Sequence, residues 1–173
     1  MMHKKITLAL VLASAIVLLA ACDSGPQPTP IGPTPTLAIQ VTPSPDMKIV
    51  YKYTGGVAGL QKELVIGPTG EATLTDRGAV VGTVDIGLDP VTELVRKFEA
   101  AKFFDFQDKY EKSDAIVSDD TYITITYTQA GRTKTVTAAQ VAGEGITPQA
   151  FLDLSDQLNQ IIISIESKGA PKP

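Results

Sequence analysis

The hydrophobic and polar positions of the chain follow two periods, and these separate predicted strands from predicted helices. Residues 121–128 alternate strictly, with Ile123, Ile125 and Tyr127 on one side, which is typical of a half-buried strand. A tight turn at Gln129-Ala130-Gly131 joins this strand to the next one, which indicates a β-hairpin. The predicted strands are residues 47–53, 60–66, 71–75, 80–86, 121–128 and 132–138.

Two other segments have the helical period. Residues 90–102 place Val91, Leu94, Val95 and Phe98 on one face. Residues 148–167 carry a longer apolar stripe, made of Phe151, Leu154, Leu158, Ile161, Ile162 and Ile165. The pattern therefore predicts an α+β domain of order ββββαββα, with an antiparallel sheet of about five to six strands packed by two helices.

The amino terminus has the layout of a secretory signal peptide. Lys4 and Lys5 form a cationic start, and residues 6–21 contain no charge and are mostly Leu, Val, Ile and Ala. This run is shorter than the roughly 20 apolar residues that a comfortable bilayer crossing needs. We therefore expect residues 1–21 to be a cleaved signal peptide.

The apolar run ends in Leu19-Ala20-Ala21-Cys22, which resembles the lipobox of bacterial lipoproteins. The resemblance implies cleavage between Ala21 and Cys22, a diacylglyceryl group on the Cys22 thiol, and acylation, for example by palmitate, of the new amine. We expect the lipid to anchor the protein at the extracytoplasmic face of the cell membrane. Two alternatives remain: an ordinary secretory cleavage site before Cys22, and an uncleaved anchor.

Beyond the lipid site, the chain divides into three predicted parts. Residues 22–46 form the lipidated Cys and a Pro/Thr-rich disordered tether, because its recurring prolines disfavour helix and interior strand. Residues 47–167 form a single α+β domain, and residues 168–173 form a flexible tail. We expect a monomer; Ile163 lies off the main helical stripe and offers a dimer contact as the alternative.

Composition excludes several kinds of chemistry. The net charge of −4 gives no general attraction for nucleic acid. The only His is His3, which would leave with the signal peptide, and the only Cys is Cys22, which would carry the lipid. The mature chain would then lack Ser-His-Asp and Cys-His sites, His-ligated zinc and iron–sulfur clusters. We expect no cofactor and no enzyme activity.

One candidate metal site lies in a polar acidic loop. Asp114, Asp119 and Asp120, with Asp105 and Asp108 nearby, could supply oxygen ligands to calcium. The regular spacing of a calcium-binding loop is absent. A solvated acidic loop is the alternative.

A second candidate site is a ligand loop formed by Tyr53, Gly55, Gly56 and Gly59. No Lys-Ser or Lys-Thr pair follows these glycines and no predicted helix begins there, so the phosphate-binding contexts are missing. Turn or bulge glycines are the alternative.

A third candidate site is a polar face on the last strand. Arg132 and Lys134 alternate there, and we expect them to lie beside Tyr122 and the threonines of the neighbouring strand. A solvated edge is the alternative.

Several short motifs of the domain resemble a family of small exported bacterial domains of unknown function, over residues 47–165. The motifs are residues 53–59, Pro68-Thr69-Gly70-Glu71, the capped helix, Phe103-Phe104, Asp120-Thr121-Tyr122-Ile123 and Gly131-Arg132-Thr133-Lys134. The resemblance supports the α+β prediction and implies no catalytic residue.

These observations together predict a membrane-anchored lipoprotein with a non-catalytic binding domain. Its partner would be a protein, a glycan or a small ligand at the cell surface. One alternative is an envelope enzyme that uses carboxylates or a Ser-Lys pair. The other is a calcium-stabilised structural domain.

Overall fold

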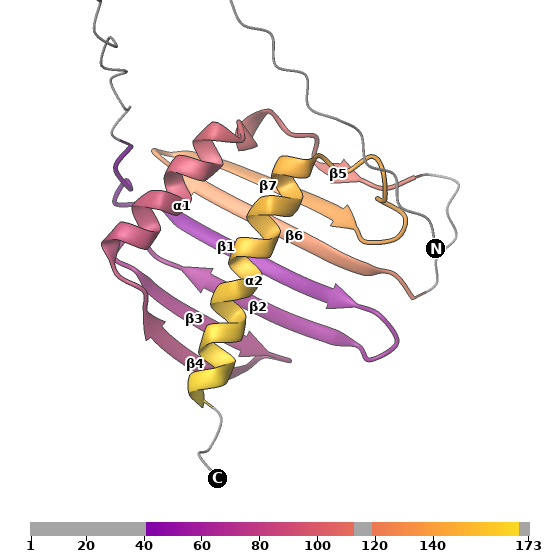
Figure 1. Cartoon of the computed structure of the whole chain (residues 1–173), viewed down its shortest axis with the longest axis horizontal. Helices are drawn as coiled ribbons and strands as arrows, with labels where there is room; N and C mark the ends of the chain where they lie inside the picture. Colours follow the sequence, from indigo (N-terminus) through magenta and orange to yellow (C-terminus); the bar gives the residue numbers. More distant parts are fainter. Residues whose placement is uncertain (1–40, 113–118, 170–173) are drawn as a thin grey trace, which may run out of the picture. The chain divides into compact units, whose positions relative to one another are not determined.

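The computed structural model describes residues 41–112 and 119–169, which belong to one compact unit. A single sheet carries two helices on one of its faces (Figure 1). Within the described residues, no helix is both long and apolar enough to cross a membrane. The predicted signal peptide and the lipobox at Leu19–Cys22 lie outside the described residues.

The sheet has seven strands in the order β4-β3-β2-β1-β6-β7-β5. The strands are β1 Lys48–Gly55, β2 Leu60–Ile66, β3 Glu71–Asp76, β4 Ala79–Asp85, β5 Lys109–Tyr110, β6 Thr121–Gln129 and β7 Arg132–Ala139. All neighbouring pairs are antiparallel except β5 and β7, which are parallel. The α+β class is confirmed, but the prediction of five to six strands in a purely antiparallel sheet is wrong. The strand that it missed, β5, has two residues and is too short to show a period.

Two helices cover the buried face of the sheet. Helix α1, Leu88–Ala100, buries the four predicted residues Val91, Leu94, Val95 and Phe98. Helix α2, Gln149–Gly169, follows the predicted stripe and continues two residues beyond the expected domain end at residue 167. A short 3-10 helix, η1 Phe103–Asp105, follows α1 and was not predicted.

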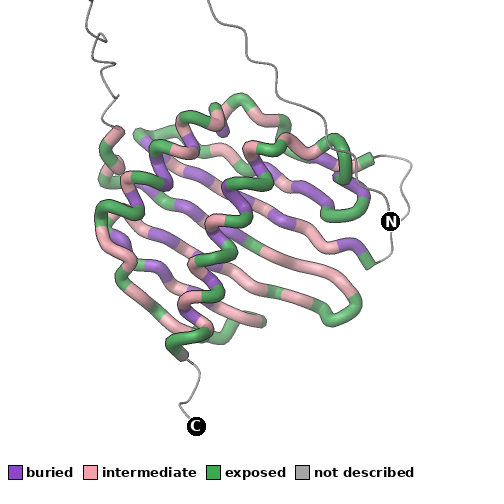
Figure 2. The backbone as a smooth tube through the Cα atoms, in the orientation of Figure 1, coloured by how far each residue is buried: buried purple, intermediate pink, exposed green. Residues whose placement is uncertain are grey.

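The two faces of the sheet differ in chemistry, as the alternation in β6 predicts. Ile123, Ile125 and Tyr127 are buried beneath the helices, and Figure 2 shows buried positions alternating along the strands. The opposite face carries cross-strand threonine pairs, whose hydroxyl oxygens are 2.9–3.1 Å apart. These pairs are Thr73–Thr83, Thr124–Thr137, Thr126–Thr135 and Thr128–Thr133.

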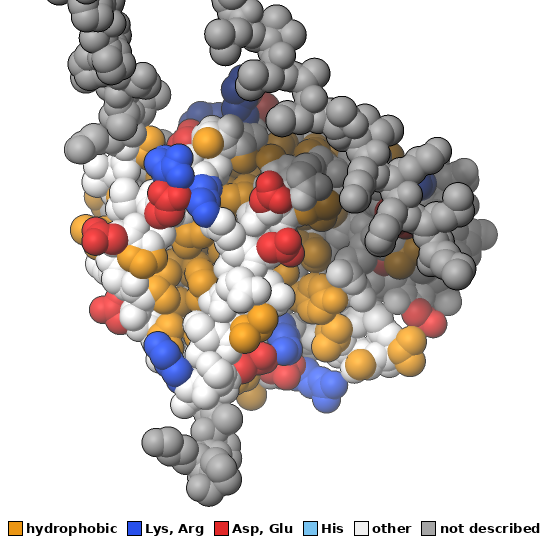
Figure 3. Space-filling model, viewed as in Figure 1, with side chains coloured by type: hydrophobic (Ala, Val, Ile, Leu, Met, Phe, Trp, Pro, Cys, Tyr) orange, Lys and Arg blue, Asp and Glu red, His pale blue; other side chains and the backbone are white. Residues whose placement is uncertain are grey.

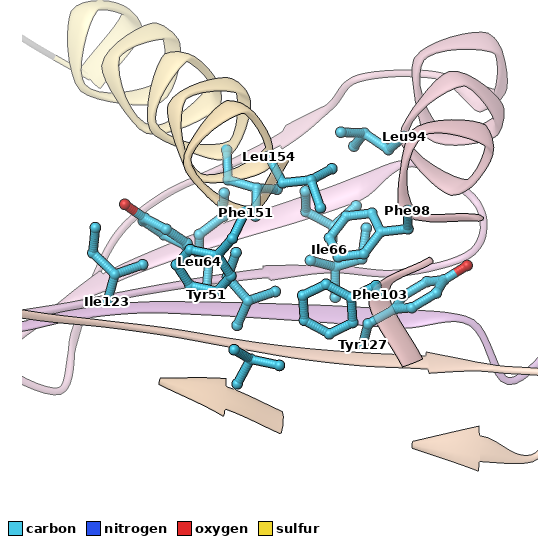
Figure 4. Packing of buried hydrophobic residues seen from close by; sticks show 14 of the residues in the cluster. Tyr51, Leu64, Ile66, Leu94, Phe98, Phe103, Ile123, Tyr127, Phe151 and Leu154 are labelled. Carbon is cyan, nitrogen blue, oxygen red and sulfur yellow. The ribbon is translucent and has the colours of Figure 1, made fainter. Parts of the chain in front are cut away.

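The core beneath α1 is aromatic. The rings of Phe98 and Tyr127 stack with centroids 4.4 Å apart, and Phe103 meets Phe98 edge-on at 5.0 Å (Figure 4). Aromatic pairs in these geometries contribute beyond their buried area. The aromatic cluster after the first helix is therefore part of the core.

A polar clasp fixes the start of the domain to the β6–β7 turn. The Ser44 hydroxyl lies within hydrogen-bond distance of the Asp46 carboxylate at 2.6 Å and the Gln129 side-chain carbonyl at 2.9 Å, shares its one hydrogen between them, and accepts from the Ala130 amide. Asp46 also accepts from the Gly131 amide. The Ser44 and Gly131 bonds hold the pKa of Asp46 below its ordinary value. Residues assigned to the tether therefore pack on the domain, whose contacts begin before the expected boundary at residue 47.

Candidate ligand pocket

A hollow that combines apolar and polar groups lies between α2 and the loop that joins β7 to α2. We call it the β7–α2 pocket. Its volume is about 450 Å³. Ile123 and Ala138 of the sheet, Val141 of the loop, and Leu152, Ser155 and Asp156 of α2 are among the residues that line it. The pocket therefore has an apolar floor and a mixed wall.

Asp120 holds the loop wall of this pocket in place. Its carboxylate accepts the amides of Val141 at 2.9 Å and Ala142 at 2.8 Å, as well as the adjacent Thr121 amide at 2.8 Å. Burial raises the pKa of Asp120, but the bonds from these amides outweigh burial and leave that pKa below its ordinary value. The residue is a buried anchor for the loop, and only 4% of its surface is exposed.

The predicted glycine loop packs against the same anchor. Gly55 and Gly56 both have positive φ, and the Gly56 amide donates to the Asp120 carbonyl at 3.1 Å. A Cβ on Gly55 would collide with the Asp120 carbonyl oxygen. These two glycines permit a close backbone approach, and the Gly59 amide donates to the Gly56 carbonyl to close the turn. The loop therefore forms a turn beside the Asp120 anchor, and Gly55 and Gly59 also line a hollow at the β1–β2 hairpin.

Two tyrosines of β1 connect the sheet to the pocket walls. The Tyr51 hydroxyl lies 3.2 Å from the Ser155 hydroxyl, and both side chains are buried. The Tyr53 hydroxyl donates to Gln140 at 3.2 Å. Burial raises the pKa of Tyr51, the Ser155 bond opposes this, and the charges of Tyr53 and Asp156 add to it. Tyr51 is therefore a neutral hydroxyl beside the pocket.

The pocket carries negative charge and an exposed aliphatic rim. Glu144 and Asp156 line it, no Lys, Arg or His does so, and neither acid forms an ion pair within the described residues. Val141 and Leu152, which form this rim, are 57% and 37% exposed. An apolar group with a positive charge would match both features.

The other predicted carboxylates are not gathered with Asp120. Asp105 ends η1, the Asp108 carboxylate pairs with Lys134 at 2.5 Å, and Asp119 is exposed. Asp114 lies outside the described residues. Across residues 41–112 and 119–169, no group of three or more His, Cys, Asp or Glu side chains could hold a metal ion.

The prediction that Arg132 and Lys134 lie beside Tyr122 and the threonines is wrong. The register pairs Lys134 with Tyr127 and Arg132 with Gln129, which places both cations on the helix side of the sheet, away from Tyr122 and the threonines. Arg132 lies over the Phe104 ring at 3.9 Å from its centroid, and Lys134 pairs with Asp108. Both residues cover the edge of the aromatic core.

In two of the other hollows the charged side chains are already paired. Hydrophobic side chains reach the surface between α1 and α2 (Figure 3), where Ile86, Leu94 and Ile161 line a shallow groove. The second hollow, at the β1–β2 hairpin, contains Lys52 and Lys62, which are paired with Glu63 and Glu166. The polar residues of the groove are Gln157, Gln160 and Glu93, which is paired with Arg96, and the cations of the hairpin hollow already have partners.

The sequence reasoning missed the α2 and loop residues of the pocket. Leu152 and Asp156 lie off the apolar stripe of α2, so the pattern marks them only as surface positions. Glu144 stands in a loop without a motif. The one sequence feature that pointed to this pocket is Leu152, an apolar residue that directly follows Phe151 and lies off the stripe.

The architecture defines a two-layer α+β domain with a pocket where the strands meet the helix layer. No curated protein matches the chain. Residues 69–162 match a family described as "Domain of unknown function (DUF6438)", and the chain belongs to this family. The match begins after β1 and β2, although β1 lies in the middle of the sheet.

Proposed function

We propose that the chain is a lipoprotein anchored through Cys22 to the extracytoplasmic face of the cell membrane, and that its domain binds a partner without catalysis. The order of cationic start, apolar run and Leu19-Ala20-Ala21-Cys22 supports the anchor. The observation that carries the binding function is the β7–α2 pocket with its exposed aliphatic rim. Exposed apolar groups around a concave surface are typical of interaction sites.

The residues of the pocket support binding over catalysis. Its lining contains no Lys, His or Cys, so Ser155 has no basic partner there to activate it as a nucleophile. The Ser155 hydroxyl instead forms a hydrogen bond with the Tyr51 hydroxyl. Asp120 is engaged by three backbone amides, which makes it a structural group.

The anchor is tested by intact-mass spectrometry of the membrane fraction from the native host. We expect a mass equal to residues 22–173 plus a diacylglyceryl group, with or without a further acyl chain. The Cys22→Ala variant should lack this species. An unlipidated mature form in the medium of cells that express the unaltered chain would contradict the proposal.

The binding function is tested by site-specific photocrosslinking on intact cells. A photoreactive side chain replaces Leu152 at the pocket rim or, as the matched control, Val80 of β4, which is 68% exposed. We expect a discrete adduct from position 152 that weakens when Val141→Asp is added, and no such adduct from position 80. Equal adducts at both positions, or none at position 152, would contradict binding at this pocket.

A further inference from the structure

The apolar and acidic residues of the β7–α2 pocket restrict which side chains a partner can present to it. Its floor is aliphatic and its rim residues Val141 and Leu152 are exposed, so a partner must supply apolar groups to cover them. Its only charged lining residues, Glu144 and Asp156, are acidic. A charged group in an apolar interface is costly unless it meets an opposite charge. The complementary partner therefore carries apolar and cationic side chains together.

The attachment of the tether restricts where this partner lies. The Ser44 and Asp46 clasp binds the turn next to the Lys48 end of β1, whereas the pocket loop leaves β7 beside the other end of β1. The first and last of the eight residues of β1 lie about 23 Å apart, at a rise of about 3.3 Å per residue. The pocket therefore opens at the end of the domain opposite the point where the tether leaves.

We propose that the β7–α2 pocket binds an extended peptide segment of another protein in which aliphatic residues are interspersed with Lys or Arg. This inference rests on the proposed binding function and specifies its ligand. Glu144 and Asp156 would pair with the cations, and Val141 and Leu152 would cover the aliphatic side chains. The volume of about 450 Å³ suits one or two side chains.

The test uses the full chain in a non-ionic detergent and three labelled six-residue peptides. One alternates leucine with lysine, and the other two carry glutamine or glutamate in place of lysine. Fluorescence anisotropy measures affinity, and methyl NMR identifies the contact surface. Glu144→Gln combined with Asp156→Asn removes the charge with little change in shape. Asp153→Asn, which neutralises an acid of α2 that lines a hollow on the α1 side, is the matched control.

We expect the lysine peptide to bind more tightly than the other two and to shift the methyl signals of Val141 and Leu152, with no shift at Val80. The double variant should weaken this binding about tenfold, as two partly exposed ion pairs would allow. Asp153→Asn should stay within about twofold, because its charge is not at the pocket.

Three results would overturn the inference. Equal affinity for all three peptides, with the pocket methyl groups shifted, would remove the charge preference and leave the proposed binding function intact. A failure of all peptides to bind would reject the ligand class, while photocrosslinking at position 152 would still test the binding function. Shifts of the same methyl groups with rising protein concentration alone, with a doubled mass by light scattering, would identify a second copy as the occupant.

Discussion

The carboxylate of Asp120 should be the most important single polar group for the β7–α2 loop, and Asp120→Asn tests this with almost no change in shape. One side-chain oxygen accepts the Val141 and Thr121 amides and the other accepts the Ala142 amide. In either orientation, the new amide nitrogen faces at least one backbone N–H and leaves it without an acceptor. The remaining bonds also lose the assistance of the negative charge.

The expected loss of stability follows from these contacts. A hydrogen bond to a charged group contributes about 1.5–3 kcal/mol, and an unsatisfied buried donor costs about 1–3 kcal/mol. We therefore expect Asp120→Asn to lower the free energy of unfolding by about 2–4 kcal/mol. Urea unfolding followed by circular dichroism measures it, with the exposed neighbour Asp119→Asn as control, which should stay within about 0.5 kcal/mol of the unaltered chain.

The pH dependence gives an independent check. The pKa of Asp120 in the folded protein lies below its ordinary value of 3.8, so the unfolded chain takes up the proton at higher pH than the folded one. The stability that the carboxylate contributes is complete above that value and is lost as the pH falls through the folded pKa. The difference between the unaltered chain and Asp120→Asn should therefore shrink below pH 3.8. A loss under about 0.5 kcal/mol at neutral pH, or a difference that persists in acid, would refute the reasoning.

Three further changes test the rest of the structure. Gly55→Ala should cost about 2–4 kcal/mol in urea unfolding, because it adds left-handed strain and a collision with the Asp120 carbonyl. Gly59→Ala, which meets no atom within 4 Å, should cost only about 1 kcal/mol; equal losses would rule out the collision. Phe103→Ala should cost about 3–5 kcal/mol, since it empties the centre of the aromatic core, and a loss below about 1 kcal/mol would contradict this packing. Asp46→Ala should speed hydrogen exchange of the Gly131 amide, its partner in the clasp, and an unchanged rate would show that the clasp does not persist in solution.

Periodicity predicted most of the fold because long elements repeat their pattern several times. The helices follow from apolar stripes that span two or more helical turns. The β6–β7 hairpin follows from alternation that repeats over several residue pairs. The two-residue strand β5 repeats nothing, so no pattern could reveal it. The face occupied by Arg132 and Lys134 was predicted wrongly because the threonines of β7 occupy the open face and the two cations alternate with them.

The candidate sites were recognised as groups of residues, but their roles depend on contacts that sequence cannot supply. Asp120 belonged to an acidic loop in sequence, yet its bonds reach Val141 and Ala142, more than twenty positions away. The glycines of the predicted ligand loop show a similar limit, because no local signal indicates that the backbone of Asp120 packs on Gly55 and Gly56. Glu144 and Asp156 become neighbours of one pocket only when α2 lies across the sheet.

The position of β1 has a consequence for the order in which the domain folds. This strand links the β2-β3-β4 half of the sheet to the β6-β7 half, and it pairs Lys48 with Thr128 and Gly55 with Thr121. These contacts close loops of more than sixty residues, and such non-local pairing slows folding because the entropy of loop closure must be lost first. The two hairpin halves can form early and locally, whereas the sheet can close only after β6 has been synthesised. A fragment limited to residues 69–162 would lack the strand that joins its two halves.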